Sequence, residues 1–151
     1  MKKLRREIIE LLKAGNCTPR ISTIASKLHS RSSTIHYNIK QLEKESAIRS
    51  YRAVFDYKKI DEGFCSFVLI SLASGSYKDP DKIAEILSKY PQVESVDIIT
   101  GRWELIIKVR TANMDEYYEF AKNLVAIGGV DKTETLNSIR QVKSEFTRAI
   151  N

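Results

Sequence analysis

Residues 93–110 read Val-Glu-Ser-Val-Asp-Ile-Ile-Thr-Gly-Arg-Trp-Glu-Leu-Ile-Ile-Lys-Val-Arg, and this stretch decides the fold of the second half of the chain. Runs rich in Val and Ile flank a glycine, which predicts a strand over 93–100, a turn at Gly101 and a strand over 103–110. Alternating residues of the second run share one face of its strand: Trp103, Leu105, Ile107 and Val109. The stretch is therefore predicted to be an antiparallel hairpin with one strongly apolar face.

Two helices are predicted on either side of this hairpin. Asp79 followed by Pro80 is typical of a helix start, because Asp caps free N–H groups and Pro suits the first turn. Asn113, with Glu116 three residues later, is a capping-box variant that starts the other helix, and the glycines at 128–129 end it. The predicted inward stripe of this second helix is Met114, Tyr117, Tyr118, Ala121, Leu124 and Val125.

Two more strands are predicted, over 64–73 and 130–142. The element order of the second half is then β-α-β-β-α-β, which is the order of a ferredoxin-like sandwich with helices on an antiparallel sheet. Helices cover only one face of such a sheet, and the apolar side chain of Ile106 lies on the other face. That face is expected to be covered by a second copy of the chain, which predicts a homodimer.

Residues 1–50 have the pattern of three short helices. An apolar stripe predicts the first helix, which ends near Gly15 because glycine accepts the left-handed conformation at a helix C-terminus. The second helix is predicted over 21–28, and the third over 32–44 after a tight turn at 29–31. The predicted inward residues are Leu4, Ile8, Leu11 and Leu12 in the first helix and Ile35, Ile39 and Leu42 in the third.

The chain between the two halves is predicted to be a strand followed by a hinge. The Ile, Tyr, Val and Phe residues of 48–55 favour a strand, and the polar residues of 56–63 favour a hinge. The predicted organisation is an N-terminal helix-turn-helix (winged-helix-like) domain over 1–50, a strand and hinge linker over 51–63, and a ferredoxin-like domain over 64–151. The fold class is therefore α+β.

Charge is unevenly distributed along the 151 residues, whose net charge is +6. Residues 1–60 carry 14 Lys and Arg against five Asp and Glu, whereas residues 61–151 carry 11 against 14. A basic module joined to a mildly acidic one favours polyanion binding by the first and a different task for the second. Because three short helices in a basic segment are typical of a helix-turn-helix, the predicted polyanion is double-stranded DNA.

The third predicted helix has the dimensions of a major-groove reader. Its 13 residues span about 20 Å at about 1.5 Å per residue, and its diameter fits the groove of B-DNA. Its N-terminus offers free N–H groups to a phosphate, and its outward face carries almost no acid before Glu43. The predicted phosphate contacts are Arg31 and Ser32, and the predicted groove contacts are Ser33, His36, Tyr37 and Lys40.

Several classes of protein are disfavoured by the sequence. Cys17 and Cys65 lie far apart with no CxxC motif, so neither a disulfide framework nor a zinc site is encoded. The longest weakly polar run, 64–73, is too short to span a bilayer. No nucleophile–base pair, phosphate-binding loop or metal-ligand set is recognisable in the sequence. The expectation is a cytoplasmic protein that is not an enzyme, has no membrane partner and uses no metal or other cofactor.

A resemblance to a known family rests on residues 25–51, which read Ala-Ser-Lys-Leu-His-Ser-Arg-Ser-Ser-Thr-Ile-His-Tyr-Asn-Ile-Lys-Gln-Leu-Glu-Lys-Glu-Ser-Ala-Ile-Arg-Ser-Tyr. The Ala-x-x-Leu, the Ile-Lys-x-Leu-Glu-Lys-Glu and the Ile-Arg-x-Tyr of this stretch are similar to the DNA-binding module of Lrp/AsnC-type (feast/famine) transcriptional regulators, particularly the archaeal ones. The β-α-β-β-α-β half, with Thr-Gly-Arg-Trp-Glu at 100–104, resembles that family's ligand-sensing and oligomerisation domain. The resemblance covers nearly the whole chain and implies a transcriptional regulator.

The resemblance also implies how the second domain works. In this family the sheets pack face to face into dimers, dimers assemble into rings that are often octamers, and small effectors, usually amino acids, bind between dimers. Glu104 then accepts an ammonium group, as Asp commonly does at this place in the family, and Arg102 donates to a carboxylate. The implied effector-binding residues are Gly101, Arg102, Trp103, Glu104, Thr133 and Thr135.

The chain departs from the family pattern at several positions. The family usually has Gly where this chain has His29 and Ser46, and the fold is expected to survive with some strain because His tolerates a left-handed backbone better than a branched residue does. Asn38 replaces a usual basic residue, and helical geometry places it near the buried side. Arg102 and Trp103 differ from the common acidic–aromatic pair, so a different ligand is expected.

Two other functions are compatible with the sequence. Siroheme decarboxylases are similar to this family, so an enzyme on the same scaffold is one alternative, although both His residues lie in the basic half. The other is an architectural DNA-binding protein without an effector, which would bind with steep salt dependence and little sequence preference. The RNA-recognition sandwich shares the element order, but the aromatic-rich strand that it needs is absent from 103–110.

Overall fold

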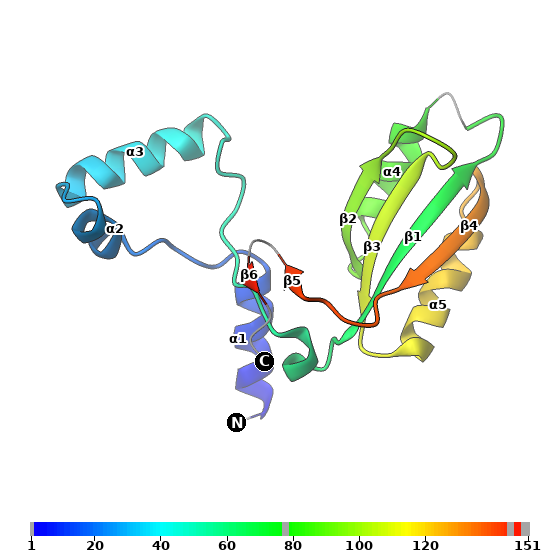
Figure 1. The fold of residues 1–151 in the computed structure, drawn as a ribbon, viewed down its shortest axis with the longest axis horizontal. Helices are drawn as coiled ribbons and strands as arrows, with labels where there is room; N and C mark the ends of the chain where they lie inside the picture. Colours follow the sequence, from blue (N-terminus) through cyan, green and yellow to red (C-terminus); the bar gives the residue numbers. More distant parts are fainter. Residues whose placement is uncertain (1, 77–78, 145–146, 149–151) are drawn as a thin grey trace. The chain divides into compact units, whose positions relative to one another are not determined.

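The computed structural model describes residues 2–76, 79–144 and 147–148 of the chain. The chain divides into two compact units, one ending at Val54 and the other beginning at Phe55. The first unit is helical, and the second contains a sheet with its helices (Figure 1). Each unit is described on its own below.

The first unit contains the three predicted helices, α1 (Lys2–Lys13), α2 (Ile21–Lys27) and α3 (Ser32–Lys44). After α1 the chain turns at Gly15, as predicted, with a φ of +89°. A Cβ at Gly15 would also lie only 3.1 Å from the carbonyl oxygen of Tyr51. Glycine is therefore favoured at this turn both by the backbone conformation and by the close approach of the chain that follows α3.

The apolar residues of the first unit are buried to very different degrees. Ala25 of α2 and Ile35 of α3 are buried where these helices pack together, and Ile39 is half-buried. Leu42, which was predicted to face inward, is exposed. In the predicted inward stripe of α1, Leu12 is half-buried. The other three members lie on the surface of the protomer, with exposures of 47–62%: Leu4, Ile8 and Leu11.

The strand predicted over 48–55 does not form, which corrects the sequence-based assignment of this segment. Its backbone has no regular secondary structure, and the Ile48 N–H donates to the Leu42 carbonyl at 3.1 Å rather than to a neighbouring strand. Branched and aromatic residues favour a strand only where another strand is available for pairing, and the described part of this unit contains helices alone. Within the predicted hinge, the chain forms a 3-10 helix, η1 (Tyr57–Ile60), in which Tyr57 is buried.

Two turns of the first unit hold residues other than glycine in the left-handed region. His29, after α2, has a φ of +49°, and Ser46, after α3, has a φ of +57°. The turn at His29 is closed by the Ser30 N–H, which donates to the Ala25 carbonyl at 3.0 Å in a Schellman-type arrangement. The strain expected at these two positions is therefore present, and it costs roughly 1–2 kcal/mol for each residue that carries a Cβ.

The substitutions His29→Gly and Ser46→Gly are each expected to raise the free energy of unfolding by about 0.5–1 kcal/mol, because the relief of strain exceeds the added entropy of the unfolded chain. Urea unfolding at one fixed protein concentration measures the change. Ser30→Gly is the matched control, since Ser30 is not among the residues with positive φ. A loss of stability in the His29 variant equal to that of the control would contradict the strain argument.

The second unit has the predicted ferredoxin-like order. Its elements after η1 are β1 (Phe64–Leu72), α4 (Pro80–Ser88), β2 (Val93–Ile98), β3 (Leu105–Thr111), α5 (Met114–Val125) and β4 (Val130–Asn137). The four strands form an antiparallel sheet in the order β2-β3-β1-β4, in which the predicted hairpin is β2-β3. Both helices lie on the same face of this sheet (Figure 1).

Local sequence signals start both helices of the second unit. α4 begins with Pro80 at its first position after Asp79, whose side chain makes no capping hydrogen bond. α5 has the predicted capping arrangement, in which the Asn113 Oδ1 accepts from the Glu116 N–H at 2.9 Å. The Glu116 Oε2 in turn accepts from the Ala112 N–H at 2.7 Å. Two otherwise unpaired N–H groups at the start of α5 are thus satisfied reciprocally.

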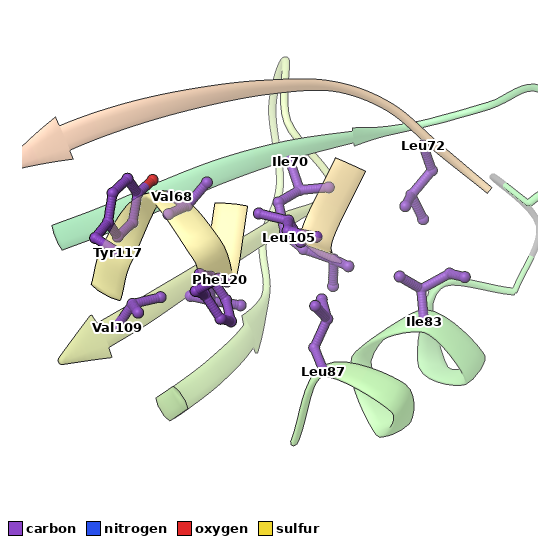
Figure 2. Packing of buried hydrophobic residues seen from close by; sticks show 11 residues of the cluster. Val68, Ile70, Leu72, Ile83, Leu87, Leu105, Val109, Tyr117 and Phe120 are labelled. Carbon is purple, nitrogen blue, oxygen red and sulfur yellow. The ribbon is translucent and has the colours of Figure 1, made fainter. Parts of the chain in front are cut away.

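The core of the second unit lies between the sheet and its two helices, as Figure 2 shows. The alternating residues of β3 point into it as predicted, and each is no more than 1% exposed: Leu105, Ile107 and Val109. Leu87 from α4 and Phe120 from α5 approach this strand from the helical layer. Removal of the apolar surface of these side chains from water is the dominant favourable contribution to the folding of this unit.

The inward stripe of α5 is displaced around the helix from its predicted position. Tyr117 and Leu124 are buried as predicted, but so is Phe120, which the predicted stripe omits. Three members of the predicted stripe are instead more than half exposed: Met114, Tyr118 and Val125. The sheet therefore packs against a face of α5 centred on Phe120.

The last predicted strand, over 130–142, is shorter than expected. β4 ends at Asn137, where the Ser66 hydroxyl donates to the Asn137 Oδ1 at 2.8 Å. Beyond it, β5 (Lys143–Ser144) and β6 (Thr147–Arg148) pair with each other in a separate two-stranded ribbon. The chain between β4 and β5 carries exposed apolar side chains, Ile139 and Val142.

Candidate functional site

The outer face of α3 gathers the side chains that were predicted to contact DNA. They come from the helix and from the residue that precedes it, and all of them are exposed: Arg31, Ser32, Ser33, His36, Tyr37 and Lys40. Burial of Ile35 on the opposite side fixes which face of α3 points outward. The face therefore presents cationic and hydrogen-bonding groups within about three turns of helix.

The N-terminus of α3 is open to an anion. Arg31 occupies the N-cap position, and its side chain makes no capping hydrogen bond. No acidic residue lies in the first turn, where Ser32 and Ser33 stand. The positive end of the helix dipole and the first N–H groups therefore meet a cationic and hydroxyl-rich surface, which is the arrangement that binds phosphate.

An acidic residue, Glu43, completes this face at its C-terminal end. Its Oε2 lies 2.7 Å from the Lys40 Nζ, and its Oε1 accepts from the Tyr51 hydroxyl at 3.1 Å. The hydrogen bond and charge of Glu43 raise the pKa of Lys40, and the hydrogen bond from Lys40 lowers the pKa of Glu43. The sequence-based list of contacts omits Glu43 and Tyr51, although the spacing of three residues between Lys40 and Glu43 is a signal for an ion pair on a helix.

Asn38 lies beside the buried stripe of α3, as helical geometry predicted, but it is not itself buried. Its side chain is exposed, and its Nδ2 donates to the Thr34 carbonyl one turn earlier at 2.8 Å. The buried stripe of α3 is narrow, because Ile35 is the one buried residue of this helix and Ile39 is only half-buried. A position beside such a narrow stripe remains at the surface.

The predicted effector residues of the β2–β3 connection form a tight, polar turn. Gly101 has a φ of +120°, and a Cβ there would meet nothing within 4 Å, so the backbone conformation alone favours glycine. Arg102 is exposed, and its guanidinium lies 5.7 Å from the centre of the Trp103 ring. A cation beside an aromatic ring at this distance is within the range of a cation–π contact.

Glu104 is tied to the neighbouring strand. Its N–H donates to the Ile70 carbonyl at 3.1 Å, and its Oε2 accepts from the Leu72 N–H at 2.8 Å. The carboxylate that was expected to accept an ammonium group thus already has a backbone donor within the protomer. A carboxylate accepts several hydrogen bonds, so this contact fixes its orientation and leaves acceptor capacity for a second donor.

The two threonines of β4 occupy different surroundings. Thr133 is the β4 partner of Ile70, so β1 brings it to the same end of the sheet as Glu104. Thr135 is the partner of Val68, and its hydroxyl lies 2.5 Å from the Tyr117 hydroxyl of α5. The structure therefore places Thr133 level with the turn, whereas Thr135 contacts the helical layer.

The face of the sheet opposite the helices carries an apolar strip. The strand registers and the alternation of side chains place on this face Phe67 and Leu69 of β1, Ile106 of β3 and Leu136 of β4. Leu136 is half exposed, and the other three are half-buried. This is the face on which a second copy of the chain was expected.

A charged network lies on the same face of the sheet. The Glu94 carboxylate contacts the Arg110 Nε at 2.5 Å and the Lys108 Nζ at 2.7 Å, and the Arg110 guanidinium covers the Tyr57 ring at 3.6 Å. Burial raises the pKa of Glu94, but hydrogen bonds from Arg110 and Lys108 and their charges outweigh burial, so this pKa lies below its ordinary value. The network attaches η1 to β2 and β3.

No helix in the described ranges has the length and apolar character needed to cross a membrane. Within residues 2–76, 79–144 and 147–148, no group of three or more His, Cys, Asp and Glu side chains is placed to hold a metal ion.

A helix-turn-helix unit with an exposed donor-rich face, joined to a ferredoxin-like unit with a polar turn, defines the class of two-domain DNA-binding regulators. The family profile of the Lrp/AsnC ligand-binding domain matches residues 65–147 of this chain. The protein belongs to the Lrp/AsnC family, as its helix-turn-helix sequence indicated.

Relatives and solved structures agree with this assignment. An uncharacterised HTH-type transcriptional regulator of Pyrococcus abyssi is 36% identical over 145 residues, which cover 95% of this chain and 96% of the relative. An AsnC family transcriptional regulator of Agrobacterium tumefaciens has the same fold, with a TM-score of 0.74 and 23% identity over 95% of this chain and 94% of its own. A transcriptional regulator of Neisseria meningitidis, solved as an L-Met complex, gives a TM-score of 0.76 with 19% identity over the same shares of the two chains.

Proposed function

We propose that this protein is a homodimeric, sequence-specific DNA-binding transcriptional regulator whose DNA affinity or assembly responds to a small metabolite of the amino-acid class. The observation that carries the proposal is the outer face of α3, which combines exposed donors with an unblocked helix N-terminus. A face of this composition is suited to phosphate contacts from its start and to base contacts along its length.

The surfaces of the protomer support self-association. The apolar strip of the sheet and the exposed apolar stripe of α1 both lie on the protomer surface. A two-fold dimer buries the same surface of both copies, and it presents two α3 helices to DNA. Such a dimer recognises a pseudo-palindrome whose half-sites lie about one helical turn, or about 10–10.5 bp, apart. Octameric rings, as the family resemblance implies, are the proposed larger assembly.

The turn at residues 101–104 supports a metabolite site. Arg102 is exposed, Trp103 is half-buried beside it, and Glu104 is held in one orientation by the Leu72 N–H. A guanidinium pairs with a carboxylate and a carboxylate with an ammonium group, so the turn offers complementary groups for a zwitterion. The fold neighbour from Neisseria meningitidis was solved with L-methionine, which supports an amino acid as the ligand class.

Fluorescence anisotropy of a labelled duplex tests the proposed function. The duplex comes from the upstream region of the protein's own gene, and it is compared with a shuffled duplex at two salt concentrations, with and without an amino-acid pool. Preference for the genuine sequence that one pool member changes is the expected result. Equal binding to both duplexes that salt abolishes indicates an architectural protein, and absence of binding at either salt favours an enzyme on this scaffold.

Lys40→Ala is expected to weaken binding to the preferred duplex about ten-fold, since loss of one base contact typically costs about 1–3 kcal/mol. Competition between preferred and shuffled duplexes measures affinity and preference together. Lys82→Ala, which removes the same charge from an exposed position of α4, is the control. Unchanged affinity and preference in the Lys40 variant would exclude this face of α3 as the groove-contacting surface.

A further inference from the structure

We propose that Glu43 is a positioning residue for Lys40, which it holds in place on the DNA-facing side of α3 and thereby weakens binding to DNA of the wrong sequence. This inference rests on the proposed DNA-binding function of α3. It adds to that function a residue of opposite charge, placed next to a predicted groove contact. Its consequence is specificity, measured as the ratio of affinities for preferred and random duplexes.

The geometry around Glu43 fixes both of its oxygens. The Lys40 Nζ lies 2.7 Å from Oε2, and the Tyr51 hydroxyl donates to Oε1 at 3.1 Å. The Glu43 side chain is only 30% exposed, whereas that of Lys40 is 60% exposed. The carboxylate is therefore the anchored partner, and the ammonium group is the one that remains accessible to DNA.

Tyr51 holds the second oxygen of the Glu43 carboxylate. Its carbonyl oxygen packs against Gly15 at the end of α1, and the segment that carries it is held to α3 by the Ile48 N–H, which donates to the Leu42 carbonyl. The hydroxyl of Tyr51 therefore reaches Glu43 from a backbone that two other elements position. A carboxylate restrained in this way loses little further entropy when it orients a lysine.

Glu43 shares a face of α3 with two of the predicted groove contacts. His36, Lys40 and Glu43 are spaced four and three residues apart, so they lie along one side of α3. Glu43 thus places a negative charge beside Lys40, on the side of α3 that is expected to approach DNA.

The pairing of Lys40 with Glu43 is expected to affect the affinity for random DNA and the affinity for the preferred sequence differently. Affinity for random DNA comes from cations that neutralise phosphates and release counterions. Lys40 is already paired with the Glu43 carboxylate, so it releases little counterion when it approaches random DNA. On the preferred sequence, Lys40 donates its remaining N–H groups to base acceptors in the groove, and a fixed ammonium position strengthens this contact.

The test compares Glu43→Gln with wild type on two duplexes across a range of salt. One duplex is the tightest that wild type selects from a random pool, and the other is a shuffled version. Glu43→Gln is expected to bind the shuffled duplex about three-fold more tightly, with a slope of log affinity against log salt that is steeper by about 0.9, as one more cation displaces a counterion. The affinity of this variant for the selected duplex is expected to increase less than its affinity for the shuffled duplex, so the specificity ratio falls.

Glu45→Gln is the charge-matched control. Glu45 is exposed at the C-cap of α3, five residues from Lys40 and thus on another side of the helix. It is expected to leave the salt slope and the specificity ratio at their wild-type values. Equal changes in the Glu43 and Glu45 variants would overturn the proposal, because the effect would then follow net charge alone.

The double variant Lys40→Ala/Glu43→Gln separates positioning from a direct effect of the carboxylate. With Lys40 absent, the Glu43 substitution is expected to leave the salt slope of the Lys40→Ala protein unchanged. A slope steeper by the same amount in both backgrounds would overturn the proposal. If Glu43→Gln unfolds, Tyr51→Phe is used in its place, because loss of the tyrosine hydroxyl loosens the Glu43 carboxylate without a change in charge. A wild-type specificity ratio in the Tyr51→Phe variant would also overturn the proposal.

Failure of the proposed DNA-binding function and failure of the positioning role give different results in these measurements. If wild type selects no duplex and binds neither probe at any salt, the DNA-binding assignment fails, and the positioning role fails with it. If wild type prefers its selected duplex and Glu43→Gln shows the same ratio and slope, only the positioning role fails.

Discussion

Arg110→Met is expected to lower the free energy of unfolding by about 3 kcal/mol, because removal of one partner of a buried ion pair leaves the other charge uncompensated. Arg110 is 8% exposed, contacts the Glu94 carboxylate through Nε and Nη2, and covers the Tyr57 ring. Methionine retains much of the apolar stem, so the loss reports the guanidinium rather than an empty space. Lys108 remains beside Glu94 and compensates part of its charge, which places the expected loss at the lower end of the range of about 3–5 kcal/mol for such changes.

Urea unfolding at one protein concentration measures this loss. The control is Lys122→Met, which breaks the pair between Lys122 and Glu119 on the surface of α5, where both side chains are at least half exposed. Exposed pairs contribute about 0–1 kcal/mol, so the control is expected to change stability by less than about 1 kcal/mol. Equal losses in the two variants would contradict the structural role of the network.

The contribution of this network depends on pH in a defined direction. The pKa of Glu94 is lowered in the folded protein, so its stabilising contribution is present above the pKa of the unfolded chain, about 4.3, and is lost as the pH falls through the lower folded value. The difference in stability between wild type and Arg110→Met is therefore expected to be largest near neutral pH and to shrink in acid. A difference that stays constant from neutral pH to about pH 3 would assign the loss to packing instead.

Local signals explain how much of the fold the sequence predicts. The capping residues Asn113 and Glu116, the Asp79–Pro80 start and the alternation along β3 each act within a few residues, and the structure has the elements that they predict. The order β-α-β-β-α-β and the bounds of α3 follow from such signals. Strand formation at 48–55 depends instead on a pairing partner, which sequence patterns within the segment do not specify.

The candidate sites also contain features that local sequence signals predict and features that depend on distant residues. The exposed face of α3 follows from helical periodicity, because it lies opposite the single buried residue Ile35. The Glu94–Arg110 contact joins residues 16 positions apart and depends on a bulge between Val93 and Ser95, which makes Glu94 an extra residue in β2. A one-residue irregularity of this kind changes which side chains meet, and alternation alone does not reveal it.

The face of α5 shows why a helix can be predicted while its buried side is not. Residues 114, 118, 121 and 125 form one helical stripe, and residues 117, 120, 121 and 124 form another about one residue further around the helix. Both stripes are apolar, because Tyr117 and Tyr118 are adjacent, as are Leu124 and Val125. Only the packing of α5 against the sheet selects the second stripe.

Phe120→Ala is expected to lower the free energy of unfolding by about 3–5 kcal/mol, because it removes a buried ring and leaves a cavity. Phe120 is 3% exposed, and its ring lies 5.7 Å from that of Tyr90 and 6.2 Å from that of Tyr117. Val125, which was also predicted to face inward, is 60% exposed, and Val125→Ala is expected to change stability by less than about 0.5 kcal/mol.

The ratio of the stability losses in Phe120→Ala and Val125→Ala, measured by urea unfolding, shows which stripe of α5 faces the sheet. A loss in the Val125 variant comparable with that in the Phe120 variant would mean that Val125 is covered in the assembled protein, for example by a second copy of the chain. The two explanations separate by dilution, since a contact between copies stabilises in proportion to the logarithm of protein concentration, whereas a contact within the protomer does not. The Phe120 loss is therefore expected to be the same at every concentration.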